Sequence, residues 1–324
     1  MQSNFNNEKP KISVADFISG APAEMEIELL AGAGGIGARQ IVSARIQKLG
    51  LALAGFTHYI HAGRIQIVGQ SEIWYLAQLE PEQRIQALRN LDLEKVCCVL
   101  ITKNLSPPSE FLEIAEEINL PVIRTPQVSS AAIVSLAGFL QEALAPQRVL
   151  HGVLMEMYGT GVLFKGESGI GKSECALDLI SRGHRLISDD AVLIKRIGDK
   201  LEGYSPELTR EHLEIRGLGI INIRDLYGIS AVGNRKQIDL CVELKKWNNV
   251  LEIERLGLET QEEDIFGIKL PKYVLPVSSG RNLSTLVETA IRVYLLKTKG
   301  VNAARDFIET HTRLLSAQAA SKQA

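Results

Sequence analysis

The chain has 324 residues, of which 45% are hydrophobic and 23% are charged, and its net charge is −2. This length and composition are typical of a globular protein of two ordinary domains. The small net charge excludes a general electrostatic attraction to nucleic acid or to an anionic membrane. No stretch approaches the about 18 apolar residues of a membrane-spanning helix, and the polar first ten residues lack the apolar region of a signal peptide. We therefore expect a cytoplasmic protein with neither nucleic acid nor a membrane as its partner.

Residue types that often bind metals show no metal-binding spacing. The four cysteines are Cys97, Cys98, Cys175 and Cys241. Because two of them are adjacent, free thiols in a reducing cytosol are a simpler interpretation than a disulfide framework. His58 and His61 are close in sequence, but no third ligand type is nearby, so ordinary surface histidines are favoured over a metal site.

In chain order, the first predicted elements are a short helix at 12–18 and an alternating strand at 26–30. Residues 32–37 then satisfy the pattern G-x-G-x-x-G, which invites a dinucleotide-binding interpretation. That fingerprint needs an acidic residue about 20 positions further on for the ribose. No Asp or Glu occurs between Glu28 and Glu72, so we predict a flexible surface loop instead.

Strands and helices alternate through the rest of this region, which indicates an α/β domain. The strands are expected at 64–69, 96–101 and 121–124, and the helices at 72–78, 81–89, 109–118 and 129–144. A linker is expected at 145–147. The predicted domains are therefore 1–145, for which a scaffold for oligomerisation is the favoured role, and 146–324.

The second domain contains a phosphate-loop motif. The residues Gly166, Glu167, Ser168, Gly169, Ile170, Gly171, Lys172 and Ser173 fit the pattern G-x-x-x-x-G-K-[ST] at every fixed position. An apolar strand precedes them at 161–165, and a helix follows at 174–182, with Gly183 placed to end it. The glycines allow backbone turns through which N–H groups converge on phosphate oxygens. Lys172 would reach the outer phosphates, and the Ser173 hydroxyl would bind Mg²⁺.

Polar residues near later strands are candidates to complete this site. Asp189 and Asp190 follow a strand, where carboxylates commonly serve Mg²⁺ or proton transfer, although a solvated acidic turn is the alternative. Glu214 and Arg216 are two apart and share a face in an extended strand, which suits a metal–phosphate site or a plain ion pair. His151, alone at the start of a strand, is more often structural than chemical.

Beyond these residues we expect a strand at 239–244, a Ser/Gly turn that carries Arg281, and two closing helices at about 283–298 and 302–317. Several short motifs of the second domain also occur in one characteristic order: 151–153, 166–173, 182–190, 213–222, 255–257 and 276–282. In this order they resemble HPr kinase/phosphorylase, a family of bifunctional enzymes that act on a serine of the phosphocarrier protein HPr. The segment 213–222 is far more specific than a phosphate loop, whereas the first domain resembles the family only in position and α/β pattern.

The resemblance implies an α/β fold with two parts. The N-terminal domain would resemble that of the MurE/MurF ligases, and the C-terminal phosphate-loop kinase domain would resemble phosphoenolpyruvate carboxykinase. It also implies a homohexamer that phosphorylates HPr from ATP or pyrophosphate with Mg²⁺. In reverse, inorganic phosphate would remove the phosphoryl group from seryl-phosphorylated HPr and give pyrophosphate. Such an enzyme would regulate carbon metabolism through the phosphotransferase system.

The resemblance also implies roles for single residues. Ser173 and Glu214 match the magnesium positions of the family, and Asp190 matches its general base. His151 matches an active-site histidine that orients Asp190 or a phosphate, and Arg255 matches an active-site arginine. The segment 276–281 matches the part tied to dephosphorylation, in which Arg281 would bind the attacking phosphate. This chain has Ser278 and Ser279 where the family often has a charged residue.

Two other functions fit part of the sequence. A phosphate-loop kinase or ATPase for a small molecule explains the loop but leaves the Glu214 segment and the Arg281 turn unused. A nucleotide-sensing module without catalysis leaves Asp190 unused. Labelled ATP with a panel of acceptors separates the three functions by transfer to a protein, transfer to a metabolite, or no transfer.

Overall fold

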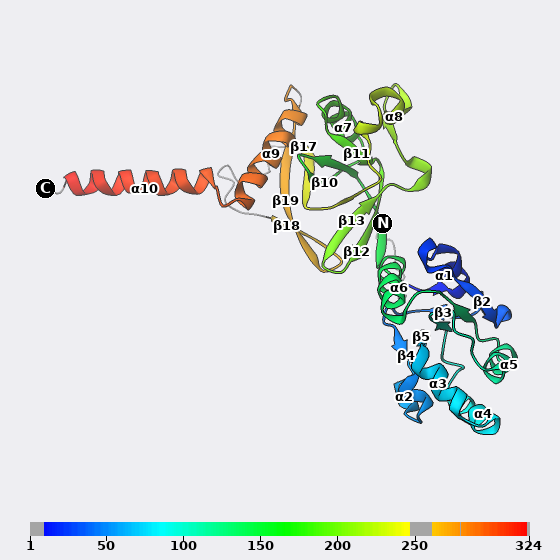
Figure 1. Ribbon diagram of the computed structural model, residues 1–324. Coiled ribbons are helices and arrows are strands. Elements are labelled where there is room, and N and C mark those ends of the chain that lie inside the picture. The colour runs from blue at the N-terminus through cyan, green and yellow to red at the C-terminus, as the bar shows by residue number, and fades with distance from the viewer. Residues whose placement is uncertain (1–9, 247–260, 279, 323–324) are drawn as a thin grey trace. The chain divides into compact units, whose positions relative to one another are not determined.

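The computed structural model describes residues 10–246, 261–278 and 280–322. The chain divides into two compact units, Met1–Pro146 and Gln147–Ala324. Each unit combines sheets with helices, so the expected α/β class is confirmed (Figure 1). In the described part of the chain, no helix is long and apolar enough to cross a membrane.

A five-stranded sheet, in the order β2-β7-β6-β5-β4, forms the centre of the first unit. Its strands are β2 (Glu28–Ala31), β4 (Gln47–Lys48), β5 (Ile65–Val68), β6 (Cys98–Ile101) and β7 (Val122–Arg124). β2 is antiparallel to β7, and the other neighbours are parallel. The helices are α1 (Val14–Gly20), α2 (Gly50–Leu53), α3 (Gln70–Gln78), α4 (Pro81–Arg89), α5 (Ser109–Glu117) and α6 (Ser129–Ala143), and the short strands β1 (Ile12–Ser13) and β3 (Gln40–Ile41) pair separately.

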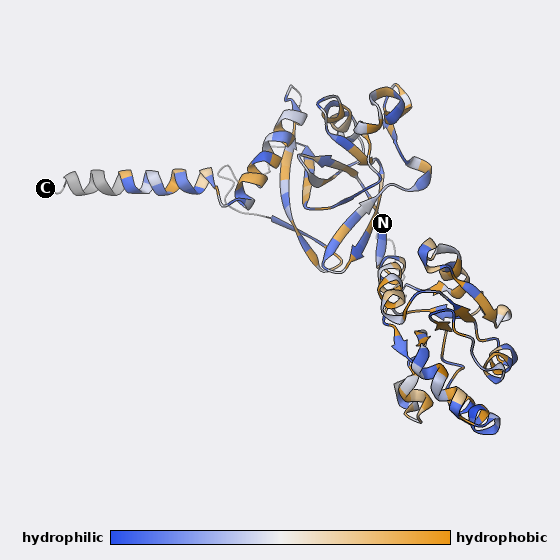
Figure 2. Ribbon diagram, viewed as in Figure 1, coloured by the Kyte–Doolittle hydropathy of each residue, from blue (hydrophilic) through white to orange (hydrophobic). Residues whose placement is uncertain are grey.

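Both faces of this sheet are covered, because alternate residues of a strand point to opposite faces. On β6, Val99 and Ile101 belong to the core formed with α3 and α5. Cys98 and Leu100 belong to the core formed with α1 and α6. A strand buried on both faces is a continuous apolar run, as the orange strands of Figure 2 show.

The glycine-rich stretch 32–37 packs against the backbone of Asn119 and Leu120. Gly32 has a φ of 73°. A Cβ atom on Gly32 would lie 2.0 Å from the carbonyl oxygen of Leu120, and one on Gly35 would lie 2.0 Å from that of Asn119. Glycine is therefore required for close backbone packing, and the expectation of a flexible surface loop is wrong.

The second unit contains a six-stranded sheet, β11-β9-β10-β17-β19-β18, a four-stranded sheet, β16-β13-β12-β8, and the hairpin β14-β15. The strands are β8 (Gln147–His151), β9 (Val153–Met157), β10 (Thr160–Gly166), β11 (Arg185–Ser188), β12 (Ala191–Ile197), β13 (Lys200–Tyr204), β14 (His212–Ile215), β15 (Gly219–Asn222), β16 (Arg235–Gln237), β17 (Leu240–Lys246), β18 (Gln261–Ile265) and β19 (Ile268–Val277). The helices are α7 (Lys172–Ser181), α8 (Ile223–Tyr227), α9 (Leu283–Thr298) and α10 (Ala303–Lys322).

The six-stranded sheet is the middle layer of this unit. On β10, Val162 and Phe164 pack with residues of α7 and α9, whereas Leu163 faces a second core shared with Val192 and Ile194 of the four-stranded sheet. β17 is parallel to both β10 and β19. The carboxyl ends of these three strands therefore meet at one edge of the sheet, which is the usual place for a ligand site in an α/β fold.

Candidate active site

The phosphate loop connects the end of β10 to the start of α7. Gly166, Gly169 and Gly171 have φ values of 149°, 78° and 100°, which side chains rarely adopt. Gly171 is the N-cap of α7, so the loop leads directly into the helix N-terminus. A helix N-terminus preceded by such a loop is a ready-made anion site, because its N–H groups have no partner within the helix.

Lys172 lies at the centre of this loop and is only 7% exposed. Its Nζ donates to the carbonyl oxygens of Gly166 at 2.9 Å and Glu167 at 3.0 Å. Burial lowers the pKa of Lys172, and the negative charges of Asp189 and Asp190 partly oppose that shift. When a phosphate binds, its oxygens can replace these two carbonyl oxygens as acceptors for the Lys172 ammonium group.

Asp190 and His151 meet where the chain crosses between the two sheets. β11 leads to β12 through Asp189 and Asp190, and β8 leads to β9 through Gly152. The Gly152 amide donates to the Asp190 carbonyl at 3.0 Å, and His151 Nδ1 lies 2.9 Å from Asp190 Oδ1. Asp190 has a φ of 63°, an uncommon backbone conformation that directs its side chain to solvent, where it is 66% exposed. The side chains of Asp190 and His151 are thus both available to a bound molecule.

Asp189, for which a solvated acidic turn is the alternative to a site role, lies at the centre of the site. It is 4% exposed. Ser173 Oγ donates to its two carboxylate oxygens at 3.0 and 3.2 Å, and the Glu214 amide donates to Oδ2 at 3.2 Å. Burial raises the pKa of Asp189, and these hydrogen bonds oppose the shift. Asp189 therefore links the phosphate-loop helix to the hairpin that carries Glu214.

Arg216 is a further candidate that the structure brings to the site. It lies in the turn after β14, beyond the strand in which it was expected to share a face with Glu214. A Cβ atom on Gly169 would lie 2.6 Å from Arg216 Nη2, so the guanidinium lies directly over the phosphate loop. The sequence signal was the Glu214–Arg216 spacing, which left a plain ion pair equally open. The contact with Gly169 favours an anion-binding role.

These residues surround a cavity of ≈ 110 Å³. It is lined by His151, Ser168, Gly169, Gly171, Lys172, Ser173, Glu174, Asp189, Asp190, Glu214 and Arg216. Of the other expected site residues, Gly166 begins the loop, Glu167 forms an exposed ion pair with Lys246, and the Ile170 side chain belongs to the core. Those three do not line the cavity, so Glu167 and Ile170 contribute to the loop through its backbone.

Two expected site residues come from segments that follow neighbouring strands. Arg281 follows β19, which ends at the same sheet edge as β10, but it does not line the cavity. Arg255 and Ser279 lie outside the described residues.

The oxygen atoms that line the cavity are suitable ligands for a magnesium ion. The Ser173 hydroxyl and the carboxylates of Asp189 and Glu214 line one space. Mg²⁺ prefers oxygen ligands and is usually held by one or two carboxylates together with substrate phosphates, whereas an all-protein cage is unusual. Among the described residues, no group of three or more His, Cys, Asp or Glu side chains is arranged to hold a metal by itself.

Comparisons with known proteins show which family models and relatives this chain matches. Residues 12–140 match the family model described as the HPr Serine kinase N terminus, and residues 142–311 match that of the HPr Serine kinase C-terminal domain. The chain is 43% identical to an HPr kinase/phosphorylase of Geobacter sulfurreducens, over 94% of this chain and 95% of the relative. It is 42% identical to one of Caldicellulosiruptor bescii, over 90% and 94%. A solved structure, the Hpr(Ser) kinase/phosphatase from Coxiella burnetii, is 35% identical over 49% of this chain and 98% of its own, with a TM-score of 0.45.

Proposed function

This chain belongs to the HPr kinase/phosphorylase family, and from that premise we propose that it acts in both directions on a serine of the phosphocarrier protein HPr. In the forward direction ATP or pyrophosphate donates a phosphoryl group to the seryl oxygen. In the reverse direction inorganic phosphate attacks the seryl phosphate, the bond between phosphorus and the seryl oxygen breaks, and pyrophosphate leaves. These reactions make the protein a regulator of carbon metabolism through the phosphotransferase system.

The phosphate loop and its cations hold the donor. Its backbone N–H groups and Lys172 bind the donor phosphates. Arg216, whose guanidinium lies next to Gly169, neutralises further negative charge of these phosphates. Phosphoryl transfer depends mainly on positioning and charge neutralisation, so these cations matter as much as any base. The glycine φ values and the buried Lys172 support this assignment.

Asp190 is the general base of the kinase direction. It accepts the proton of the seryl hydroxyl while the phosphoryl group transfers, and as an acid it returns that proton to the departing seryl oxygen in the reverse direction. The contact with His151 at 2.9 Å fixes the orientation of the carboxylate. The exposed position of Asp190 supports this role, because the acceptor is a protein and must approach from solvent.

Mg²⁺ would be held by the Ser173 hydroxyl and the Glu214 carboxylate. When bound, the ion would neutralise the charge of the donor phosphates. Asp189 orients Ser173 through its two hydrogen bonds and fixes the Glu214 backbone, so it sets the relative position of both ligands.

Two arginines complete the proposed site. Arg281, which follows β19 at the phosphate-loop edge, binds the inorganic phosphate that attacks in the reverse direction. Arg255, which is outside the described residues, adds a further positive charge.

The broader assignments are part of the same proposal. Residues 146–324 carry catalysis with a nucleotide site like that of phosphoenolpyruvate carboxykinase. Residues 1–145 resemble the N-terminal domain of the MurE/MurF ligases and serve as the scaffold of a cytoplasmic homohexamer.

The convergence of Lys172, Ser173, Asp190 and Glu214 on one cavity is the observation that carries the proposal. The test is mass spectrometry of HPr after incubation with this protein, ATP and Mg²⁺, followed by inorganic phosphate. We expect one phosphoryl group to appear on serine and then to be lost with release of pyrophosphate. Absence of the gain while ATP is bound would contradict the proposal and favour another acceptor.

A further inference from the structure

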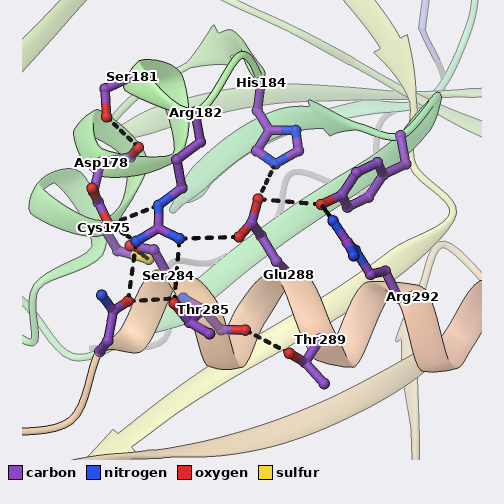
Figure 3. A network of polar contacts seen from close by, with 12 residues as sticks. Cys175, Asp178, Ser181, Arg182, His184, Ser284, Thr285, Glu288, Thr289 and Arg292 are labelled. Carbon is purple, nitrogen blue, oxygen red and sulfur yellow. Dashed lines mark hydrogen bonds and ion pairs between the residues drawn. The ribbon is translucent and has the colours of Figure 1, made fainter.

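A network of side chains joins the C-terminal end of α7 to the first turns of α9 (Figure 3). Its centre is Arg182, the C-cap residue of α7. The Arg182 guanidinium donates to Asp178 Oδ2, one turn earlier on α7, at 2.9 and 3.2 Å. It also donates to Thr285 Oγ1 and Glu288 Oε2, each at 3.2 Å, and to Asn282 Oδ1 at 3.4 Å. None of these residues lines the cavity described above.

Glu288 is the second centre of the network. Its Oε1 lies 2.9 Å from Nε2 of His184, which is only 7% exposed, and accepts from the Tyr158 hydroxyl at 3.2 Å. Arg292 in turn donates to the Tyr158 oxygen at 2.7 and 3.1 Å. Burial alone would raise the pKa of Glu288, but the hydrogen bonds from His184 and Tyr158 and the charge of Arg182 lower it overall. Glu288 therefore remains an anion and holds Arg182 in place.

Arg182 contacts the start of α9 at its cap, and α9 is also held by its buried side chains Ser284, Val287 and Ile291. Asn282 is the N-cap of α9 and accepts from the Thr285 amide at 2.9 Å, so Arg182 contacts the cap itself. α7 is secured independently of Arg182 by the buried side chains Cys175, Ala176, Leu179 and Ile180. Its C-terminus is closed by backbone bonds from Gly183 and His184. Loss of the Arg182 side chain should thus loosen the first turn of α9 while leaving the phosphate loop in place.

Arg281 immediately precedes the Asn282 cap. The turn that carries it leaves β19 at the edge where β10 leads into the phosphate loop. We infer that Arg182 is a positioning residue for the phosphorolysis direction, because its bonds to the first turn of α9 set the place of Arg281 relative to the phosphate loop. This inference rests on the proposed function, in which Arg281 binds the attacking phosphate. The donor phosphates of the kinase direction bind on α7, which keeps its own packing.

The test compares Arg182→Gln with the matched variant Arg185→Gln. Arg185 lies three residues further along, donates to the Val232 carbonyl and pairs with Glu156, and among the described residues it makes no hydrogen bond or ion pair with α9. In Arg182→Gln we expect the KM for inorganic phosphate in the dephosphorylation of seryl-phosphorylated HPr to rise about tenfold, with the KM for ATP in the kinase direction within about twofold of wild type. Arg182→Lys should recover little, because one ammonium group cannot make the same fork of bonds. Arg185→Gln should leave both KM values near wild type.

Hydrogen exchange supplies a readout that does not depend on activity. The Thr285 amide, protected by the Asn282 side chain, should exchange faster in Arg182→Gln and not in Arg185→Gln. An unchanged KM for inorganic phosphate in a folded Arg182→Gln protein would overturn the inference. An equal fall in kcat/KM for phosphorylation and for dephosphorylation would also overturn it, because that result indicates a merely structural role. A wild-type protein without phosphorolysis would instead refute the proposed function, and the exchange data would then decide whether Arg182 positions α9.

Discussion

Replacement of Asp190 by asparagine tests the proposed chemistry with little disturbance of the fold. Asparagine has nearly the same shape, accepts a hydrogen bond from His151, and tolerates the positive φ of 63° at this position. The side chains of His151 and Asp190 are 53% and 66% exposed, so their contact stabilises the fold by only about 0–1 kcal/mol. The variant should therefore fold and bind nucleotide like the wild type.

The loss of activity should be large because only the proton acceptor is removed. A positioned general base contributes a factor of about 10²–10⁴, or about 3–5 kcal/mol of activation free energy. The loop, Lys172 and Glu214 stay in place and still supply charge neutralisation, so we expect the lower part of that range, about 10²–10³. Phosphorylation from ATP and phosphorolysis by inorganic phosphate should both lose activity, because each needs the same carboxyl group to accept or return the proton of the seryl oxygen.

The assay follows phosphorylation and dephosphorylation of HPr by mass spectrometry, with ATP affinity measured by calorimetry on the same preparations. His151→Asn serves as a comparison, since it removes the orienting contact but keeps the base and should cost less activity. Phosphorylation of HPr at the wild-type rate by Asp190→Asn would show that Asp190 is not the base. A loss of ATP binding in parallel would show that the residue acts on the donor instead.

Three further predictions test the surroundings of the cavity. Lys172→Ala should weaken ATP binding by about 10- to 100-fold, since it removes a charge-assisted bond to the phosphates, and unchanged affinity in calorimetry would contradict the loop assignment. Burial raises the pKa of Asp189 above its ordinary value of 3.8, so the stability that this group adds is present below pH 3.8 and is lost as the pH rises through the folded-state pKa. Asp189→Asn should remove that part of the pH dependence in denaturant unfolding, and identical profiles for variant and wild type would count against the raised pKa. Gly152→Ala should lower the unfolding free energy by about 1–3 kcal/mol, because its Cβ would lie 2.4 Å from the Phe164 carbonyl oxygen. Gly138→Ala in α6, with nothing within 4 Å, should instead raise it by about 0.5–1 kcal/mol, and equal effects of the two variants in thermal unfolding would refute the steric argument.

Much of the local backbone could be predicted from the sequence. The glycine spacing of the phosphate loop and the end of α7 at Gly183 follow from conformational preferences that act within a few residues, and the structure confirms them. The helix begins at Lys172, earlier than the expected residue 174. The strands expected at 64–69, 96–101 and 121–124 are likewise confirmed as β5, β6 and β7. The same reasoning failed at Gly32, because the pattern showed that glycine was needed but not that the Leu120 backbone packs against it.

Which polar side chains contact one another could not be predicted in this way, because it depends on how the strands pair and how the helices pack. His151 contacts Asp190 because β8 pairs with β12, and Ser173 contacts Asp189 because α7 returns the chain to β11. Asp189 and Asp190 share the same position at a strand end, and only the family resemblance distinguishes Asp190, yet Asp189 is 4% exposed and Asp190 is open to solvent. Strand register and helix docking set such differences, and both depend on contacts between residues far apart in the chain, which no local pattern encodes.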